Sequence, residues 1–220
     1  MKRYEFELGM NIIKKFFPHY RIKDKLDVTR ILLEAIRFML VWPNVPKGNT
    51  VGRLILYIDK MSRLFFISKN KYYSIVFPFL VKKVEEKFFF SLKNIVEIDS
   101  ELISKAMSIL NSEHFEKISS IDFIEPIFEY EERINKKFWF FLKELLIFED
   151  GYIRYDHDVE NYKRAKEKGK EDIHPLNHYD LFYTSNATFK IGLNNAIREE
   201  DFIRLLDINQ KCEYLTNRST

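Results

Sequence analysis

The sequence predicts an α+β fold in which an antiparallel sheet, formed by a meander and a C-terminal hairpin, packs against several helices. Two hydrophobic patterns support this prediction. Between residues 51 and 95, aromatic and β-branched residues form short runs separated by polar turns, which is typical of strands. On both sides of this region, apolar residues recur every three or four positions, which is typical of helices. With 46% hydrophobic residues, the chain can form a core.

A length of 220 residues fits one domain. We therefore predict a single α+β domain over 1–220. It can be subdivided into 1–98, with a helix and a basic aromatic meander, and 99–220, with helices and a sheet that carries polar motifs. The two parts differ in charge, because residues 1–93 hold 19 Lys and Arg against 8 Asp and Glu, whereas residues 94–220 hold 17 against 25. This asymmetry favours either an anionic partner for the first part or attraction between the two parts.

The expected elements follow in order. A short helix at 11–17 ends at Pro18, and a longer one at 26–42 has Asp27 as its N-cap and ends at Pro43. Pro78 indicates a sheet edge or a strand end. The strands of the meander are expected at 51–59, 63–68, 71–81 and 87–95.

In the second part, a helix at 100–112 is capped by Asp99 or Ser100. The helix at 124–146 is apolar on most sides, which indicates a central position or an interface. The remaining predictions are a strand at 152–158, a solvated loop at 161–172, a hairpin over 179–193 that turns at Ser185 and Asn186, a helix at 199–208 and a terminal strand at 211–215.

Several functional classes are excluded by what the sequence lacks. Cys212 is the only cysteine, so neither an intrachain disulfide nor a cysteine-rich zinc site can form. The chain has no P-loop, dinucleotide-binding glycine pattern, catalytic serine elbow or kinase motif. Its apolar runs are interrupted by charge and too short to span a bilayer, so we expect a soluble, cytoplasmic protein without membrane contact.

A polar cluster is expected between residues 154 and 180. Because strand side chains alternate between faces, Arg154, Asp156 and Asp158 share one face, while His157 points to the other. In the next strand, His178 and Asp180 share a face. If the two strands are neighbours, one arginine, three carboxylates and one imidazole converge.

This convergence has two interpretations. Asp and His can bind Mg²⁺ or Mn²⁺, which activate water against a phosphodiester, with Arg154 on the phosphate. Without a metal, a His–Asp pair can act as acid or base. The candidate catalytic residues are Arg154, Asp156, Asp158, His178 and Asp180. The alternative is a structural network of ion pairs on an open sheet face.

The predicted meander also carries lysines among aromatic residues, a pattern that can bind single-stranded nucleic acid by charge and stacking. The candidate nucleic-acid-binding residues are Lys69, Lys71, Lys82, Lys83 and Lys87. The alternative is that the aromatic residues belong to the core, while the lysines protect sheet edges from pairing.

The segments FEDGYIRYDHD, HPLNHYDLFY and TFKIGL resemble uncharacterised bacterial proteins assigned to a domain of unknown function. In those proteins an Arg-x-Asp-x-Asp strand precedes a His-Pro-x-x-His element. The resemblance covers about the last 75 residues. Asp180 stands where the pattern would have a further His, which argues against a site built on imidazoles and is compatible with a carboxylate–imidazole site. The matching positions are Arg154, Asp156, Asp158, His174, Pro175 and His178.

Proteins with this pattern are typical of phage-defence and mobile-element neighbourhoods. The resemblance therefore implies an accessory subunit of a bacterial defence complex, or a toxin-like effector. We expect the accessory subunit, with protein partners in a hetero- or homo-oligomer and with nucleic acid as a further contact. The alternative is a nuclease or another phosphodiester-acting enzyme that uses the 154–180 cluster with Mg²⁺ or Mn²⁺.

Overall fold

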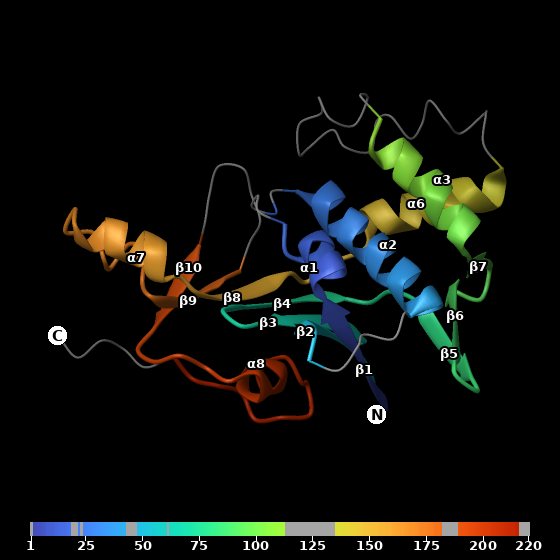
Figure 1. Ribbon diagram of the computed structural model, residues 1–220. Coiled ribbons are helices and arrows are strands. Elements are labelled where there is room, and N and C mark those ends of the chain that lie inside the picture. The colour runs from blue at the N-terminus through green and yellow to red at the C-terminus, as the bar shows by residue number, and fades with distance from the viewer. Residues whose placement is uncertain are drawn as a thin grey trace.

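A seven-stranded antiparallel sheet forms the centre of the molecule (Figure 1). The computed structural model describes residues 2–18, 22, 24–42, 48–60, 62–112, 135–181 and 189–215. The strands of this large sheet are, in spatial order, β1 (Lys2–Gly9), β2 (Thr50–Ile58), β3 (Arg63–Ser68), β4 (Lys71–Val76), β8 (Ile153–His157), β9 (Asn177–Asp180) and β10 (Lys190–Leu193).

A small antiparallel sheet and six helices complete the described part of the chain. The small sheet contains β5 (Leu80–Val84), β6 (Lys87–Leu92) and β7 (Val96–Ile98). The helices are α1 (Met10–Phe16), α2 (Lys25–Val41), α3 (Ser100–Leu110), α6 (Lys136–Ile147), α7 (Val159–Lys166) and α8 (Glu199–Leu205). The predicted α+β class is therefore confirmed.

The main hydrophobic core lies between one face of the large sheet and most of the helices. Helix α2 contributes Leu32 and Ile36, which are fully buried against Leu54 of β2 and Phe66 of β3. The same cluster includes residues of α3, α6 and the inner face of the small sheet. Helix α8 covers the opposite face of the large sheet, where Phe202 is fully buried in a second, smaller core (Figure 1).

Strand β1 is an element for which the sequence analysis assigned no structure. It pairs antiparallel with β2 from Lys2 opposite Ile58 onward. Its apolar residues alternate with charged ones, so that Phe6 and Leu8 are buried in the main core while Glu5 and Glu7 face away from it. This is the period of two that a half-buried strand requires.

The expected meander is divided into two sheets. The predicted strand at 71–81 ends at Val76, and a separate strand, β5, begins at Leu80 in the small sheet. Pro78 lies between them, which confirms a strand end there, because proline has no amide hydrogen for a sheet ladder. Strand β4 instead pairs with β8, which follows the small sheet and α6 in the sequence.

The helix predictions are mostly confirmed. Helix α2 begins one turn earlier than the predicted cap implies, because the side chain of Asp24, not Asp27, accepts the capping hydrogen bond from the amide of Asp27 at 2.9 Å. Asp99 caps α3 as expected. In α6, Phe138 and Phe141 are buried in the main core, and residues 124–134 of the helix predicted at 124–146 lie outside the described residues.

Two predictions for the C-terminal part are wrong. The polar segment 161–172 is not wholly a loop, because α7 covers 159–166 with Asp158 as its N-cap and with no buried residue. Residues 211–215 form no strand in the structure, and Tyr214 is 89% exposed. Strands β9 and β10 do pair as a hairpin, whereas its predicted turn at Ser185 and Asn186 lies outside the described residues. Within the described part of the chain, no helix is long and apolar enough to cross a membrane.

Candidate functional sites

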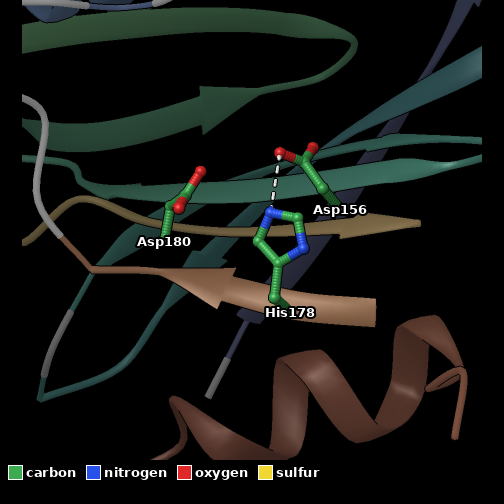
Figure 2. Close-up of side chains that lie close together, drawn as sticks. All are labelled: Asp156, His178 and Asp180. Atoms are coloured by element: carbon green, nitrogen blue, oxygen red, sulfur yellow. Dashed lines mark ion pairs between the residues drawn. The ribbon is translucent and has the colours of Figure 1, made fainter. Parts of the chain in front are cut away.

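A cluster of charged side chains lies on β8 and β9, which are neighbours in the large sheet. Arg154 stands opposite Asp180, and Asp156 stands opposite His178. Residues opposite each other in an antiparallel pair share a face, so all four side chains converge on one side of the sheet. Figure 2 shows Asp156, His178 and Asp180 together above these strands. The exposed fractions of these three residues are 5%, 0% and 2%.

Arg154 connects the two carboxylates of this cluster. Its Nε atom lies 2.8 Å from Oδ2 of Asp156, and its Nη2 donates to Oδ2 of Asp180. Only 12% of the Arg154 side chain is exposed. Burial alone would lower the pKa of this guanidinium, but Tyr152, Asp156 and Asp180 around it raise the pKa above its ordinary value. The arginine is thus permanently charged and is ion-paired with both carboxylates.

Lys190 of β10 is the second cation of the cluster. Its Nζ atom donates to Oδ1 of Asp180 at 2.8 Å and lies 2.7 Å from Nε2 of His178. Burial would raise the pKa of Asp180, but Arg154 and Lys190 outweigh it and hold the pKa below its usual range. Two carboxylates therefore face two cations, and the charges balance.

His178 is held in one tautomer. Its Nδ1 atom lies 2.8 Å from the carbonyl oxygen of Pro175, which can only accept a hydrogen bond, so Nδ1 carries the proton. The lone pair of Nε2 then faces Lys190. Burial lowers the pKa of His178, and the ammonium of Lys190 lowers it further. The imidazole is therefore neutral.

Sequence reasoning missed Lys190, and the predicted turn could not have revealed it. The register of the hairpin pairs Lys190 with Asp180, so that both side chains lie on one face. A two-residue turn at Ser185 and Asn186 would instead pair Asp180 with Ile191 and place Lys190 on the opposite face.

Asp158 does not belong to the cluster, contrary to the sequence prediction. The strand ends at His157, and Asp158 caps α7 by accepting a hydrogen bond from the amide of Asn161 at 3.1 Å. Its Oδ2 also lies 3.0 Å from Nε2 of His174. These contacts outweigh partial burial and lower the pKa of Asp158 to about 2. The rings of His174 and His178 meet edge to face with their centroids 5.0 Å apart.

His157 points to the opposite face of the sheet, as alternation predicts. Its Nδ1 atom lies 2.7 Å from Oδ1 of Asn177, which also accepts a hydrogen bond from the hydroxyl group of Tyr155 at 3.0 Å. Tyr155 belongs to the smaller core under α8. His157 therefore contributes to packing on that side and not to the charged cluster.

The candidate nucleic-acid-binding lysines fall into two separate groups. Lys69 and Lys71 lie at the β3–β4 turn, where Lys71 approaches Oδ1 of Asp156 at 3.8 Å. Lys82, Lys83 and Lys87 lie on the β5–β6 hairpin of the other sheet. They do not form one continuous surface along a single meander, because the chain changes sheets after Val76.

The second candidate site is the outer face of the small sheet. Leu80, Lys82 and Val84 of β5 lie opposite Ser91, Phe89 and Lys87 of β6, respectively, and we call these six residues the outer face. The remaining lysine, Lys83, stands opposite Phe88 on the other face of the hairpin, where its Nζ atom lies 3.2 Å from Oε2 of Glu86 and 5.6 Å from the ring centroid of Phe88. The outer face therefore combines apolar side chains with two exposed lysines.

Comparison with known proteins adds no relative. No family model, no curated protein and no solved structure matches the chain. The resemblance of the Arg-x-Asp-x-Asp and His-Pro-x-x-His elements to a bacterial family therefore stays a prediction. What the protein does is inferred below from the charged cluster and the outer face.

Proposed function

We propose that the chain is an accessory subunit of a bacterial defence-type complex and binds a partner protein through its outer face. The observation that carries this proposal is the exposure of three large apolar side chains on one sheet surface. Leu80, Val84 and Phe89 are 48%, 44% and 43% exposed. A contiguous apolar patch with polar residues around it is typical of a protein-binding surface.

The charges of the outer face favour a partner of a particular kind. Lys82 stands directly opposite Phe89, and Lys87 stands opposite Val84. A matching surface would bring carboxylates to the two lysines and apolar side chains to Phe89 and its neighbours. A second copy of the chain fits less well. Antiparallel pairing of β5 with itself about Lys82 would bring like charges together, and lysine on an edge strand opposes such pairing.

The burial of the charged cluster also supports a binding role for the chain. His178 is fully buried and Asp180 is 2% exposed, so neither is open to a substrate. Arg154 and Lys190 already have carboxylate partners within the protein. The cluster thus resembles an internal ion-pair network, whereas the outer face is open to solvent.

Size-exclusion chromatography with light scattering tests this proposal. The chain would be run alone and with the purified products of neighbouring genes. We expect a complex with one of these products that Phe89→Asp weakens at least tenfold, about 1.4 kcal/mol of binding free energy. The matched control is Ile173→Asp, which changes an apolar residue that is 70% exposed beyond α7. An equal effect of both variants, or a monomer that binds none of these products, would contradict the proposal.

Phosphodiester chemistry at the charged cluster is a second candidate function. It is favoured by the adjacency of β8 and β9, which brings Asp156, His178 and Asp180 together as sequence reasoning required. The test is incubation of the chain with labelled RNA and DNA and with Mg²⁺ or Mn²⁺. Cleavage by the wild-type chain that Asp156→Asn abolishes would support this function. If neither the wild-type chain nor the variant cleaved RNA or DNA, this function would be contradicted.

A further inference from the structure

We propose that Asp156, His178 and Asp180 form a divalent-cation site, and that the ammonium group of Lys190 holds this place in the metal-free protein. The inference is independent of the outer face and does not require the chain to be an enzyme. A divalent cation would occupy the charged cluster, and Lys190 would compete with it for the same position.

The first argument is the donor set. One oxygen from each carboxylate and one nitrogen of His178 lie within 4.8 Å of one another (Figure 2). Atoms that bind the same ion at about 2.0–2.2 Å in tetrahedral geometry lie about 3.3–3.6 Å apart. The three donor atoms therefore need to close by at most about 1.5 Å to bind one ion. Two carboxylates and one imidazole suit Mn²⁺ or Zn²⁺ better than Mg²⁺, because nitrogen is a softer ligand than oxygen.

The second argument is the tautomer of His178. A histidine that binds a metal usually donates its other ring N–H to a carbonyl or carboxylate, which fixes the ring orientation. His178 has this arrangement already, since the Pro175 carbonyl accepts from Nδ1 at 2.8 Å. The Nε2 atom, whose lone pair faces Lys190, lies 3.9 Å from Oδ2 of Asp156, inside the cluster (Figure 2). The imidazole ring therefore already has the tautomer and the orientation of a metal ligand.

The third argument is the position of Lys190. Its ammonium nitrogen lies 2.7 Å from Nε2 of His178 and 2.8 Å from Oδ1 of Asp180, so it contacts two of the three proposed ligands. A lysine is a point charge on a flexible stem of four carbons. Its side chain is 18% exposed and belongs to β10, an edge strand among the described residues. It can therefore swing outward when a metal ion replaces it.

The fourth argument is an oxygen atom without a donor. Oδ1 of Asp156 is buried and has no hydrogen-bond partner among the described residues. The residue is 5% exposed, and the ammonium of Lys71 remains 3.8 Å away. Lys190 thus satisfies Asp180 and His178 but not Asp156. Arg154 lies against the other oxygen, Oδ2, and a metal ion shared by all three residues would supply a partner for Oδ1.

Metal titration of the full chain tests the inference. After treatment with a chelator, the protein would be titrated with Mn²⁺, and free Mn²⁺ would be measured by its electron paramagnetic resonance signal. We expect one ion per chain. We also expect Lys190→Met to bind Mn²⁺ about tenfold tighter or more, a size of effect typical of residues around a metal site. Asp156→Asn, which retains the shape of the side chain, would weaken binding by a similar factor.

Lys71→Met is the matched control, because it removes one lysine charge near the cluster, 3.8 Å from Oδ1 of Asp156, without emptying the proposed position of the ion. We expect its affinity to change much less than that of Lys190→Met. Thermal unfolding of each variant without metal verifies that it is folded. If both variants bound Mn²⁺ more tightly by the same factor, the effect would be one of general charge, and the proposal that the ion displaces Lys190 would be wrong. An absence of saturable binding in the wild-type chain and in Lys190→Met would overturn the site itself.

Discussion

The substitution Arg154→Met tests whether the charged cluster is held together as a buried ion-pair network. It replaces the guanidinium with an apolar side chain of similar length. Asp156 and Asp180 each lose their ion pair with Arg154. Both carboxylates remain buried, with exposed fractions of 5% and 2%. Lys190 still contacts Asp180, but no comparable contact remains for Asp156, since Lys71 is 3.8 Å away.

The expected loss of stability follows from these contacts. A hydrogen bond to a charged group contributes about 1.5–3 kcal/mol, which is the contribution of the bond to Asp180, and the ion pair with Asp156 adds to it. Removal of one partner from a buried ion pair independently suggests about 3–5 kcal/mol. We therefore expect a loss of about 4 kcal/mol. A domain of this size is stable by about 5–15 kcal/mol, so most of the variant molecules stay folded at low temperature.

Urea denaturation of chelator-treated protein measures this loss. The control is Arg53→Met, because Arg53 also contacts two carboxylates, Glu5 at 3.2 Å and Glu199, but its side chain is 37% exposed. The control should lose less than about 1 kcal/mol. Combining Arg154→Met with Asp156→Asn should recover most of the loss, because Asp156 carries the charge that is left without a close cation, whereas Asp180 keeps Lys190. A single-variant loss no larger than that of the control would refute the reasoning.

Three further predictions concern pH and close packing. Because burial and its cationic neighbour lower the pKa of His178 below 6.5, the unfolded chain takes up a proton that the folded chain does not. Stability should therefore fall as the pH drops below about 6.5, until the pH reaches the pKa of His178 in the folded protein. Urea midpoints measured at neutral and mildly acidic pH should show this fall, and the substitution His178→Gln should make it smaller. Gly192→Ala should lower the melting temperature, because its Cβ would lie 2.9 Å from Cγ of Pro175. Gly52→Ala should destabilise the protein by about 1–3 kcal/mol in urea unfolding, because its Cβ would lie 2.8 Å from the backbone oxygen of Ile67. Wild-type stability in either glycine variant would show that the backbone there can yield.

The charged cluster was predictable because side-chain alternation depends only on the backbone. A period of two placed Arg154 with Asp156, and His178 with Asp180, before the pairing of their strands was known. Asp158 was misplaced because alternation holds only as far as the strand continues. Aspartate before a polar helical segment is a strong N-cap, and this preference ended the strand at His157.

The division of the strands between two sheets could not be predicted from periodicity. Alternating residues show that a segment is a strand, but they do not show its neighbours. Pro78 indicated the end of one strand, yet only the three-dimensional packing shows that β5 leaves the large sheet. Strand β1 was missed for a different reason: charged residues dominate its sequence, although Tyr4, Phe6 and Leu8 have the period of a half-buried strand.

The connection between β4 and β8 has a consequence for the order in which the chain folds during synthesis. The amide of Val76 donates to the carbonyl of Asp150 at 2.7 Å, so the chain leaves the large sheet and returns to it at nearly the same point. Residues 77–149 are thus an insertion into an otherwise continuous meander. Pairing across such a sequence separation closes a long loop and is slow compared with hairpin formation. During synthesis, the strands that carry Arg154 and His178 join the sheet only after the whole insertion has left the ribosome.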